Sequence, residues 1–219
     1  MNKIKKAIII LILIGFLPVF GAEVLPYYIN SLKRVAIGFT NVQSPLVLRK
    51  TPQEDGEILE TVNFDFEKNV SCLENKQRCS LEEVFSAYST EKKIALLTTV
   101  DETQGWSLVC FNQSEKPVCG WAEEKKNKYY NWTDFFNIYG RKYGVYLFKD
   151  LQKTDKILYS APLKQTNSVG TIDMPRKIDP WLIRGNWILV KVYDFNNQLK
   201  TGWINFRFDN GKLKLFVNF

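Results

Sequence analysis

The sequence predicts a mainly β chain built from two similar units in tandem. A hairpin pattern occurs twice, once from Trp106 to Gly120-Trp121 and again from Trp187 to Gly202-Trp203. The two tryptophans of each pattern are 15 residues apart in the first copy and 16 in the second. Apolar runs bounded by turn residues are typical of paired strands, and a glycine inside a strand lets a neighbouring backbone approach closely. Each copy is therefore expected to contain a tryptophan-bearing hairpin.

The repeat extends toward the N-terminus of each copy. Four pairs of positions share a spacing of 110 residues: Leu48 and Leu158, Pro52 and Pro162, Thr61 and Thr171, and Val62 and Ile172. Trp106 and Trp187 are only 81 residues apart. The difference between 110 and 81 predicts a 29-residue insertion between Val62 and Trp106. A constant spacing over several residues indicates a duplicated structural unit.

These residues resemble the bacterial SH3-like domain family, known as SH3b, which opens with a strand ending in Arg-x-x-Pro. Leu48-Arg49, Pro52, Trp106 and Gly120-Trp121 carry the resemblance in the first copy. The second copy departs from it at Tyr159, where the family has Arg, and at Asn186, which separates Gly185 from Trp187. The resemblance covers about residues 45–125 and 145–207. It implies two small SH3-like antiparallel barrels in tandem and association with cell-wall peptidoglycan, most often with its peptide stems.

The N-terminus has the pattern of a secretory signal peptide. Lysines at positions 3, 5 and 6 precede an apolar stretch at 7–20, and Val19-Phe20-Gly21 suits cleavage before Ala22. The stretch is shorter than the about 20 residues that span a membrane. We therefore expect residues 1–21 to be removed, no stable transmembrane anchor to remain, and the protein to be periplasmic or secreted. A retained N-terminal anchor is the alternative.

The predicted charge is modest after export. Removing three lysines from 30 basic residues leaves 27 against 23 acidic residues, a net charge of +4. This charge suits an anionic wall or membrane surface without requiring one. Together with the export pattern it argues against nucleic acid as a partner.

The domain boundaries follow from the repeat. We expect four parts: a signal peptide at 1–21, a first SH3b-like unit at 22–125 with an insertion at about 63–92, a linker at 126–144, and a second unit at 145–219.

Two short helices and a terminal hairpin are expected outside the repeated strands. Ser80 and Glu83 have the spacing of a capping box, which predicts a helix over about 81–89. A second helix is expected in the linker, with Thr133 as its cap and Gly140 as its end. Its aromatic residues are predicted to pack between the units: Trp132, Phe135, Phe136 and Tyr139. Asp209-Asn210-Gly211 predicts a hairpin turn near the C-terminus.

All four cysteines lie in the first unit, and export favours disulfide formation. Four cysteines allow three connectivities, of which we favour Cys72–Cys79 and Cys110–Cys119. The second pair would join the two strands of the first tryptophan hairpin, and the first pair would close the inserted loop, whose short helix follows. A zinc site is the alternative, but the chain has no Cys-x-x-Cys and no His.

The absence of histidine also removes the Ser-His and Cys-His nucleophile systems and the commonest general base. No catalytic residue, metal site or cofactor is predicted. The paired carboxylates at Asp65 and Glu67 could serve a glycosidase, but alternation along a solvated strand explains them equally well. We expect no enzyme activity, with an enzyme of unrecognised site as the remaining alternative.

A ligand of a small filled barrel must bind at its surface, where loops on a rigid scaffold form grooves. In the second unit, the loops at 168–179 and 193–200 flank the tryptophan hairpin. We predict that Trp181 and Tyr193 stack on a ligand and donate hydrogen bonds to it. The candidate cations for its carboxylates are Arg176, Lys177 and Arg184 in the second unit, with Arg49 as the matching residue of the first unit. In the alternative interpretation Arg49 is structural and the loops are merely solvated.

The sequence thus predicts an exported, non-catalytic binding protein that contacts peptidoglycan through SH3b-like units. The alternative is a protein–protein adaptor or inhibitor that binds another cell-envelope protein.

Overall fold

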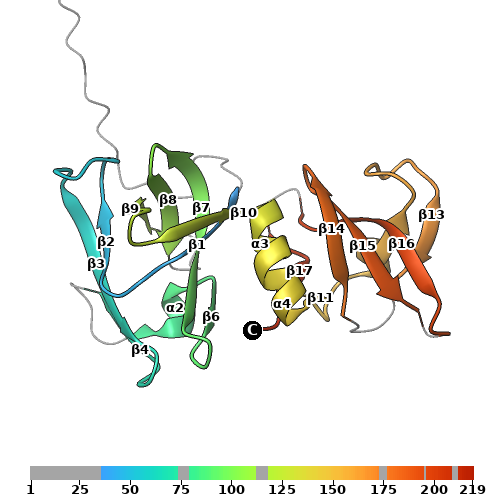
Figure 1. Cartoon of the computed structure of the whole chain (residues 1–219), viewed down its shortest axis with the longest axis horizontal. Coiled ribbons are helices and arrows are strands. Elements are labelled where there is room, and N and C mark those ends of the chain that lie inside the picture. Colours follow the sequence, from blue (N-terminus) through green and yellow to red (C-terminus); the bar gives the residue numbers. More distant parts are fainter. Residues whose placement is uncertain (1–35, 74–78, 112–117, 173–176, 195, 209–211) are drawn as a thin grey trace, which may run out of the picture.

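A computed structural model describes residues 36–73, 79–111, 118–172, 177–194, 196–208 and 212–219. The predicted signal peptide lies outside these residues. The fold is mainly β, as predicted. Two larger sheets lie on either side of a short helical run, and a small two-stranded sheet lies next to that run (Figure 1).

The first large sheet has the strand order β10-β1-β7-β8-β9-β2-β3-β4-β5, and β6 pairs with β7 outside this path. Its strands in chain order are β1 (Gly38–Asn41), β2 (Leu46–Arg49), β3 (Ile58–Asp65), β4 (Val70–Leu73), β5 (Cys79–Ser80), β6 (Ala87–Ser89), β7 (Ile94–Thr103), β8 (Trp106–Phe111), β9 (Val118–Glu123) and β10 (Lys128–Asn131). All pairings are antiparallel.

The second large sheet has five strands in the order β13-β12-β16-β15-β14. Its strands are β12 (Ile157–Tyr159), β13 (Ser168–Thr171), β14 (Asp179–Arg184), β15 (Trp187–Tyr193) and β16 (Leu199–Asn205). The two-stranded sheet pairs β11 (Val145–Leu147) with β17 (Leu215–Val217), and a 3-10 turn, η2 (Lys153–Lys156), precedes β12.

The two units have the same strand topology. Along the chain, β2, β3, β7, β8 and β9 match β12, β13, β14, β15 and β16, and both sets have the same order of neighbours. Trp121 pairs with Arg49, as Trp203 pairs with Tyr159. The register of each unit also shifts at two matched places. One shift follows Leu48 in the first unit and Leu158 in the second. The other lies around Val100 in the first unit and Trp181 in the second. The repeat seen in the sequence is thus a repeat in structure.

The Gly-Trp motif has a steric cause. A Cβ atom added at Gly120 would lie 2.8 Å from the Cβ of Leu48, and one added at Gly202 would lie 2.9 Å from the Cβ of Leu158. Real Cβ atoms do not approach so closely, so each glycine is required for the returning strand to pack on the first strand of its unit.

The sheets are not closed barrels. Among the described strands, β13 and β14 are the two edges of the five-stranded sheet and are not paired with each other. The first unit has the matching gap between β3 and β7. The two units therefore share one strand order, and in each unit the two described strands at the gap are not joined by backbone hydrogen bonds, which leaves an open seam.

The inserted segment is more β than predicted. Its helix α2 spans only Leu81–Val84, although both hydrogen bonds of the expected capping box between Ser80 and Glu83 are present. Phe85 is already extended, and the following residues form β6 against β7. The prediction of a helix to residue 89 is wrong, because pairing with a long neighbouring strand outweighs helix propagation over so few residues.

The linker helix also differs from its prediction. It runs through α3 (Trp132–Phe135), a π-helical segment η1 (Phe136–Gly140) and α4 (Arg141–Tyr143). Asn131, not Thr133, is its cap, because the Asn131 side chain accepts a hydrogen bond from the backbone N–H of Asp134. Gly140 keeps helical dihedral angles, and the helix instead ends at Gly144, whose φ is 94°.

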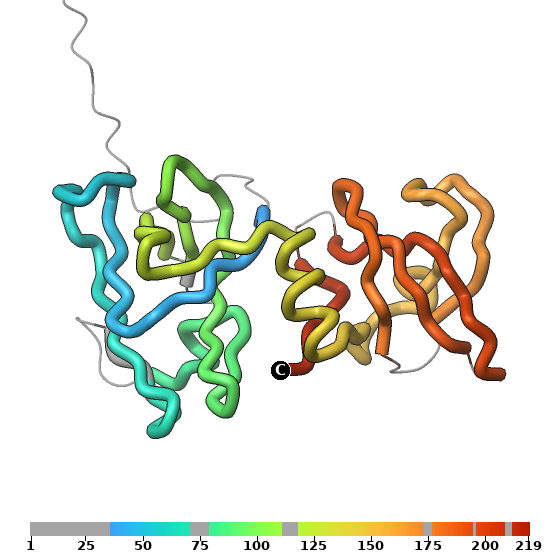
Figure 2. The backbone as a smooth tube through the Cα atoms, viewed as in Figure 1, coloured from blue at the N-terminus to red at the C-terminus, as the bar shows by residue number. Residues whose placement is uncertain are grey.

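The helix lies between the two sheets (Figure 2), and its buried side chains join their cores. Its predicted packing role is confirmed, because the four aromatic residues are buried in one hydrophobic cluster with side chains of both units: Trp132, Phe135, Phe136 and Tyr139. The backbone carbonyl of Ala36 accepts hydrogen bonds from Trp132 Nε1 at 3.0 Å and from Arg207 Nη1 at 2.6 Å. These contacts tie the start of the first unit to the end of the second.

The C-terminal segment doubles back as expected. Arg207 forms an antiparallel bridge with Leu213, and the Phe208 N–H donates to the Lys212 carbonyl at 2.8 Å. The predicted turn at Asp209-Asn210-Gly211 lies outside the described residues.

Candidate binding face on the second sheet

The outer face of β14, β15 and β16 contains the predicted aromatic site residues. Along β15 the side chains of Ile188, Val190 and Val192 are buried, so those of the alternate residues from Trp187 to Tyr193 lie on the opposite face. Exposed residues gather on this side of the sheet: Trp181, Leu182, Tyr193 and Leu199. We call it the outer face of the second unit.

Trp181 is held in place by two polar neighbours. It lies at the register shift of β14, where it is 51% exposed. Its Nε1 donates to Asp179 Oδ2 at 3.2 Å, and Lys191 Nζ lies 3.4 Å from its ring centroid. The structure does not favour the prediction that the indole N–H donates to a ligand, because this N–H already donates a hydrogen bond to Asp179. The exposed Trp181 ring, with the Lys191 ammonium over it, is what this position offers to a ligand.

Tyr193 stands at the end of β15, 53% exposed and opposite Leu199 in β16. The turn that follows is ordered by Asp194, whose Oδ1 accepts from the backbone N–H groups of Asn196 and Gln198, each at 2.9 Å. Asp194 also pairs with Lys200 at 3.3 Å. The hydrogen bond from Gln198, with smaller contributions from Lys200 and Asn196, lowers the pKa of this carboxyl. Tyr193 is thus attached to a well-braced turn.

The predicted cations are dispersed. Arg184 lies on the outer face, opposite Trp187, with its guanidinium carbon 5.7 Å from the Trp203 ring centroid. Lys177 is exposed next to Ile178, which bridges to Val145, so it lies near the helical run rather than on this face. Arg176 lies outside the described residues.

Arg49 has a structural contact in the first unit. Its Nη1 donates to the carbonyl of Gly56 at 2.6 Å and braces the turn between β2 and β3. This contact favours the structural interpretation of the arginine that the family resemblance singles out.

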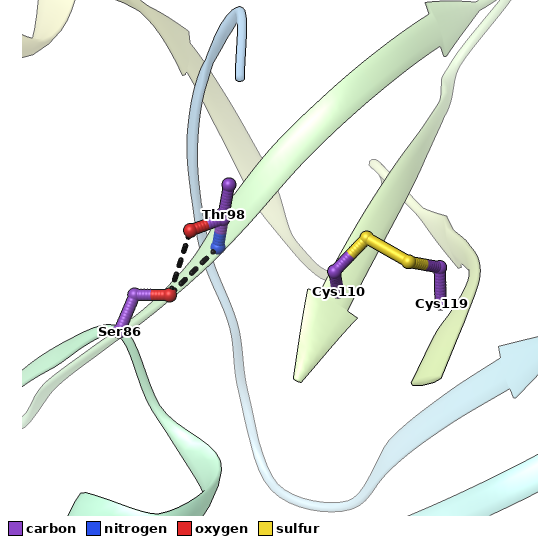
Figure 3. Close-up of a disulfide and its surroundings, with 4 residues drawn as sticks. All are labelled: Ser86, Thr98, Cys110 and Cys119. Carbon is purple, nitrogen blue, oxygen red and sulfur yellow. Dashed lines mark hydrogen bonds between the residues drawn. A yellow bond between two sulfur atoms is a disulfide. The ribbon is translucent and has the colours of Figure 1, made fainter. Parts of the chain in front are cut away.

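In the first unit, the side chains at the corresponding positions are buried. A separate buried cluster contains them: Val100, Trp106, Leu108, Cys110, Cys119 and Trp121. The predicted disulfide Cys110–Cys119 is confirmed and joins opposite positions of β8 and β9 (Figure 3). The matched positions in the second unit are Lys191 and Thr201, which also lie opposite each other. Val100 corresponds to Trp181, so a buried valine and a disulfide in one unit stand where the other has an exposed tryptophan, a lysine and a threonine.

The other predicted disulfide remains a prediction. Cys79 lies in β5 opposite Ser71 of β4, but the side chain of Cys72 is outside the described residues. The inserted segment is joined to β7 through Ser86, whose Oγ accepts from the Thr98 N–H at 3.2 Å and lies 2.8 Å from Thr98 Oγ1 (Figure 3).

Lys191 was missed by the sequence reasoning. It lies two residues before Tyr193, which the sequence pattern places in a loop. Extending the strand from Trp187 through Tyr193 would have placed both side chains on one face and found Lys191. Leu182 and Leu199 carry no comparable sequence pattern, since their exposure depends on how the strands pair.

Comparisons with models of protein families, with curated proteins and with solved structures found no match to this chain. In the part of the chain that the structure describes, no helix has the length and apolar character needed to span a membrane. No group of three or more His, Cys, Asp or Glu side chains suited to a metal ion occurs in those same residues.

Proposed function

We propose that the protein is an exported, non-catalytic binding protein whose second unit contacts the peptide stems of peptidoglycan through its outer face. The observation that carries this proposal is the pair of exposed aromatic residues Trp181 and Tyr193 beside Lys191. The matched positions 100 and 110 of the first unit are a buried valine and a disulfide cysteine. Among the residues that the structure describes, this face carries exposed aromatic side chains beside a cation in only one of the two like units, which supports a ligand-binding role for it.

Each unit is proposed to be an SH3-like barrel with one open seam. The shared strand order and the matched Gly120 and Gly202 support this assignment. The disulfide Cys110–Cys119 is compatible with the export expected from the N-terminal sequence.

The dimensions of the face suit a short extended peptide. Six residue steps separate Trp187 from Tyr193 along β15, which correspond to about 20 Å at a rise of about 3.3 Å per residue. An extended peptide of about six residues has the same length. Lys191 and Arg184 provide cations for carboxylates of the stem, and the aromatic rings provide apolar contact area at low entropic cost.

A protein partner is the second candidate. Leu182 and Leu199 are 43% and 50% exposed on the same face, and β14 is an edge strand of its sheet. Exposed apolar side chains beside an open strand edge are typical of surfaces that bind proteins. This observation supports the adaptor or inhibitor role.

Sedimentation with purified cell wall tests the proposal. The variant Trp181→Ala/Tyr193→Ala should bind at least about tenfold more weakly, a loss of about 1.4 kcal/mol, because central aromatic residues dominate binding energies. The matched control is Phe148→Ala, which removes an aromatic side chain that is 44% exposed on another part of the surface. Equal binding by the double variant and the control would refute the site. Absence of wall binding by the unmodified protein, with capture of an envelope protein, would favour the adaptor role.

A further inference from the structure

A small pocket opens at the other end of the outer face from Tyr193. It has a volume of about 150 Å³ and is lined by residues of η2, β12, β15 and β16, together with Lys164 and Lys214. Pockets for drug-sized ligands begin at about 300 Å³, so this one suits a single small group. Trp187, the first residue of β15, lies in its wall.

The pocket contains a buried lysine. The side chain of Lys214 is 6% exposed, and its Nζ lies 2.7 Å from Asp155 Oδ1. The same ammonium is 4.5 Å from the ring centroid of Phe208. A lysine ammonium has three protons to donate. Within the described residues, its side-chain contacts are this carboxylate and this ring face, so donor capacity remains for a ligand in the pocket.

The charge of the lining selects a monoanion. Lys164 and Lys214 contribute two positive charges and Asp155 one negative charge, which leaves a net charge of +1. A phosphate dianion would exceed that charge and would face the Asp155 carboxylate. A single carboxylate matches it and is the anion that a lysine donor binds through a charge-assisted hydrogen bond.

The remaining walls suit the residue that carries such a carboxylate. Tyr159 and Trp187 meet edge to face with their ring centroids 5.6 Å apart, which provides an apolar wall for a small side chain. Asn205 and Thr154 line the pocket beside them and can bond to a peptide amide. Because Trp187 and Tyr193 share one face of β15, a chain lying along that face would reach the pocket with its end.

We propose that this pocket binds the free carboxylate at the end of a short peptide. The pocket accommodates one small residue, the last of that peptide. The inference deepens the proposed function, on which it rests for the identity of the longer chain: the outer face holds the body of the peptide and the pocket holds its terminus.

Titration of the mature protein with alanyl-alanine, in its L and D forms, tests the pocket by the NMR signal of the Trp187 indole. The free dipeptide should shift this signal, and the same dipeptide with a C-terminal amide should bind at least tenfold more weakly. Inorganic phosphate should also bind at least tenfold more weakly than the dipeptide. Equal binding of the acid and the amide, tighter binding of phosphate, or no shift at Trp187 would overturn the proposal.

Lys164→Gln removes a charge at the exposed edge of the pocket and should weaken dipeptide binding at least fivefold. The matched control is Lys153→Gln, an exposed lysine of the adjoining turn that does not line the pocket. The pair Asp155→Asn/Lys214→Met removes both members of the ion pair together, so the buried lysine is not replaced while its carboxylate partner is left unpaired. It removes the buried donor and should reduce the preference for acid over amide at least fivefold, the remainder coming from Lys164. An unchanged preference would contradict the proposal.

The two proposals fail separately. Dipeptide binding without wall binding would support the pocket and overturn the peptidoglycan function. Wall binding that is unaffected by Lys164→Gln, in a protein that ignores the dipeptide, would overturn the pocket and leave the function in place. The Trp181→Ala/Tyr193→Ala variant should bind the dipeptide normally while losing the wall.

Discussion

Replacement of both disulfide cysteines, Cys110→Ala/Cys119→Ala, should destabilise the protein by about 4 to 5 kcal/mol. The bond links residues separated by 9 positions, for which the chain-entropy relation gives about 2.6 kcal/mol at about 25 °C. Both side chains are also buried, at 3% and 4% exposure, in the cluster that contains Trp106 and Trp121. Removing each buried sulfur should add about 1 kcal/mol.

Urea unfolding followed by tryptophan fluorescence measures this loss. The total is large against the about 5–15 kcal/mol that stabilise an ordinary domain. The slope of the unfolding free energy with urea should rise slightly, because the uncrosslinked unfolded chain exposes more surface. Measuring the variant with and without reductant corrects for any effect of reductant on the other two cysteines. A loss below about 1 kcal/mol would refute the reasoning, since neither chain entropy nor packing would then depend on the bond.

Three further outcomes are expected. Lys191→Cys/Thr201→Cys should form a disulfide on oxidation, because these positions are opposite each other as Cys110 and Cys119 are, and non-reducing mass mapping checks it. Gly202→Ala should destabilise the protein by at least about 1–3 kcal/mol in urea unfolding, because the added Cβ would meet Val169 Cγ2 at 2.7 Å; wild-type stability would contradict the steric account. The pKa of Asp194 is lower in the folded protein than its ordinary value of 3.8, so the ionised carboxylate stabilises the native state at pH values above 3.8. This stabilisation should be lost as the pH falls through the lowered pKa. Unfolding measured against pH should show this dependence in the wild type and less of it in Asp194→Asn.

Much of the architecture was predictable because it depends on local constraints. The hairpins at Trp106 and Trp187 follow from alternation and from turn residues, and the Cys110–Cys119 bond follows from their placement on one such hairpin. The capping box at Ser80 was also visible, because it needs only two residues at a fixed spacing.

The extent of each helix was not predictable from the same signals. The helix after Ser80 ends at Val84 because β7 pairs with the residues that follow. The helix after Asn131 passes through Gly140, where a Cβ would lie 2.8 Å from Val145 Cγ2, so the glycine serves close packing rather than termination. In both cases a contact with a segment distant along the chain decided the outcome.

The candidate site divides in the same way. The sequence by itself singled out Trp181 and Tyr193 as aromatic residues near the loops of the second hairpin region. It placed Tyr193 in a loop, whereas the structure places Tyr193 at the end of β15 and Trp181 within β14. Only the tertiary structure decided that Lys191 lies over the Trp181 ring, that Asp179 accepts a hydrogen bond from the Trp181 indole N–H, and that Lys177 lies away from both. It also brought Lys214 to Asp155, 59 residues earlier in the chain, inside one pocket. Such pairings depend on sheet register and on closure between distant segments, and these are set by the burial of the whole core rather than by the residues that the pairings join.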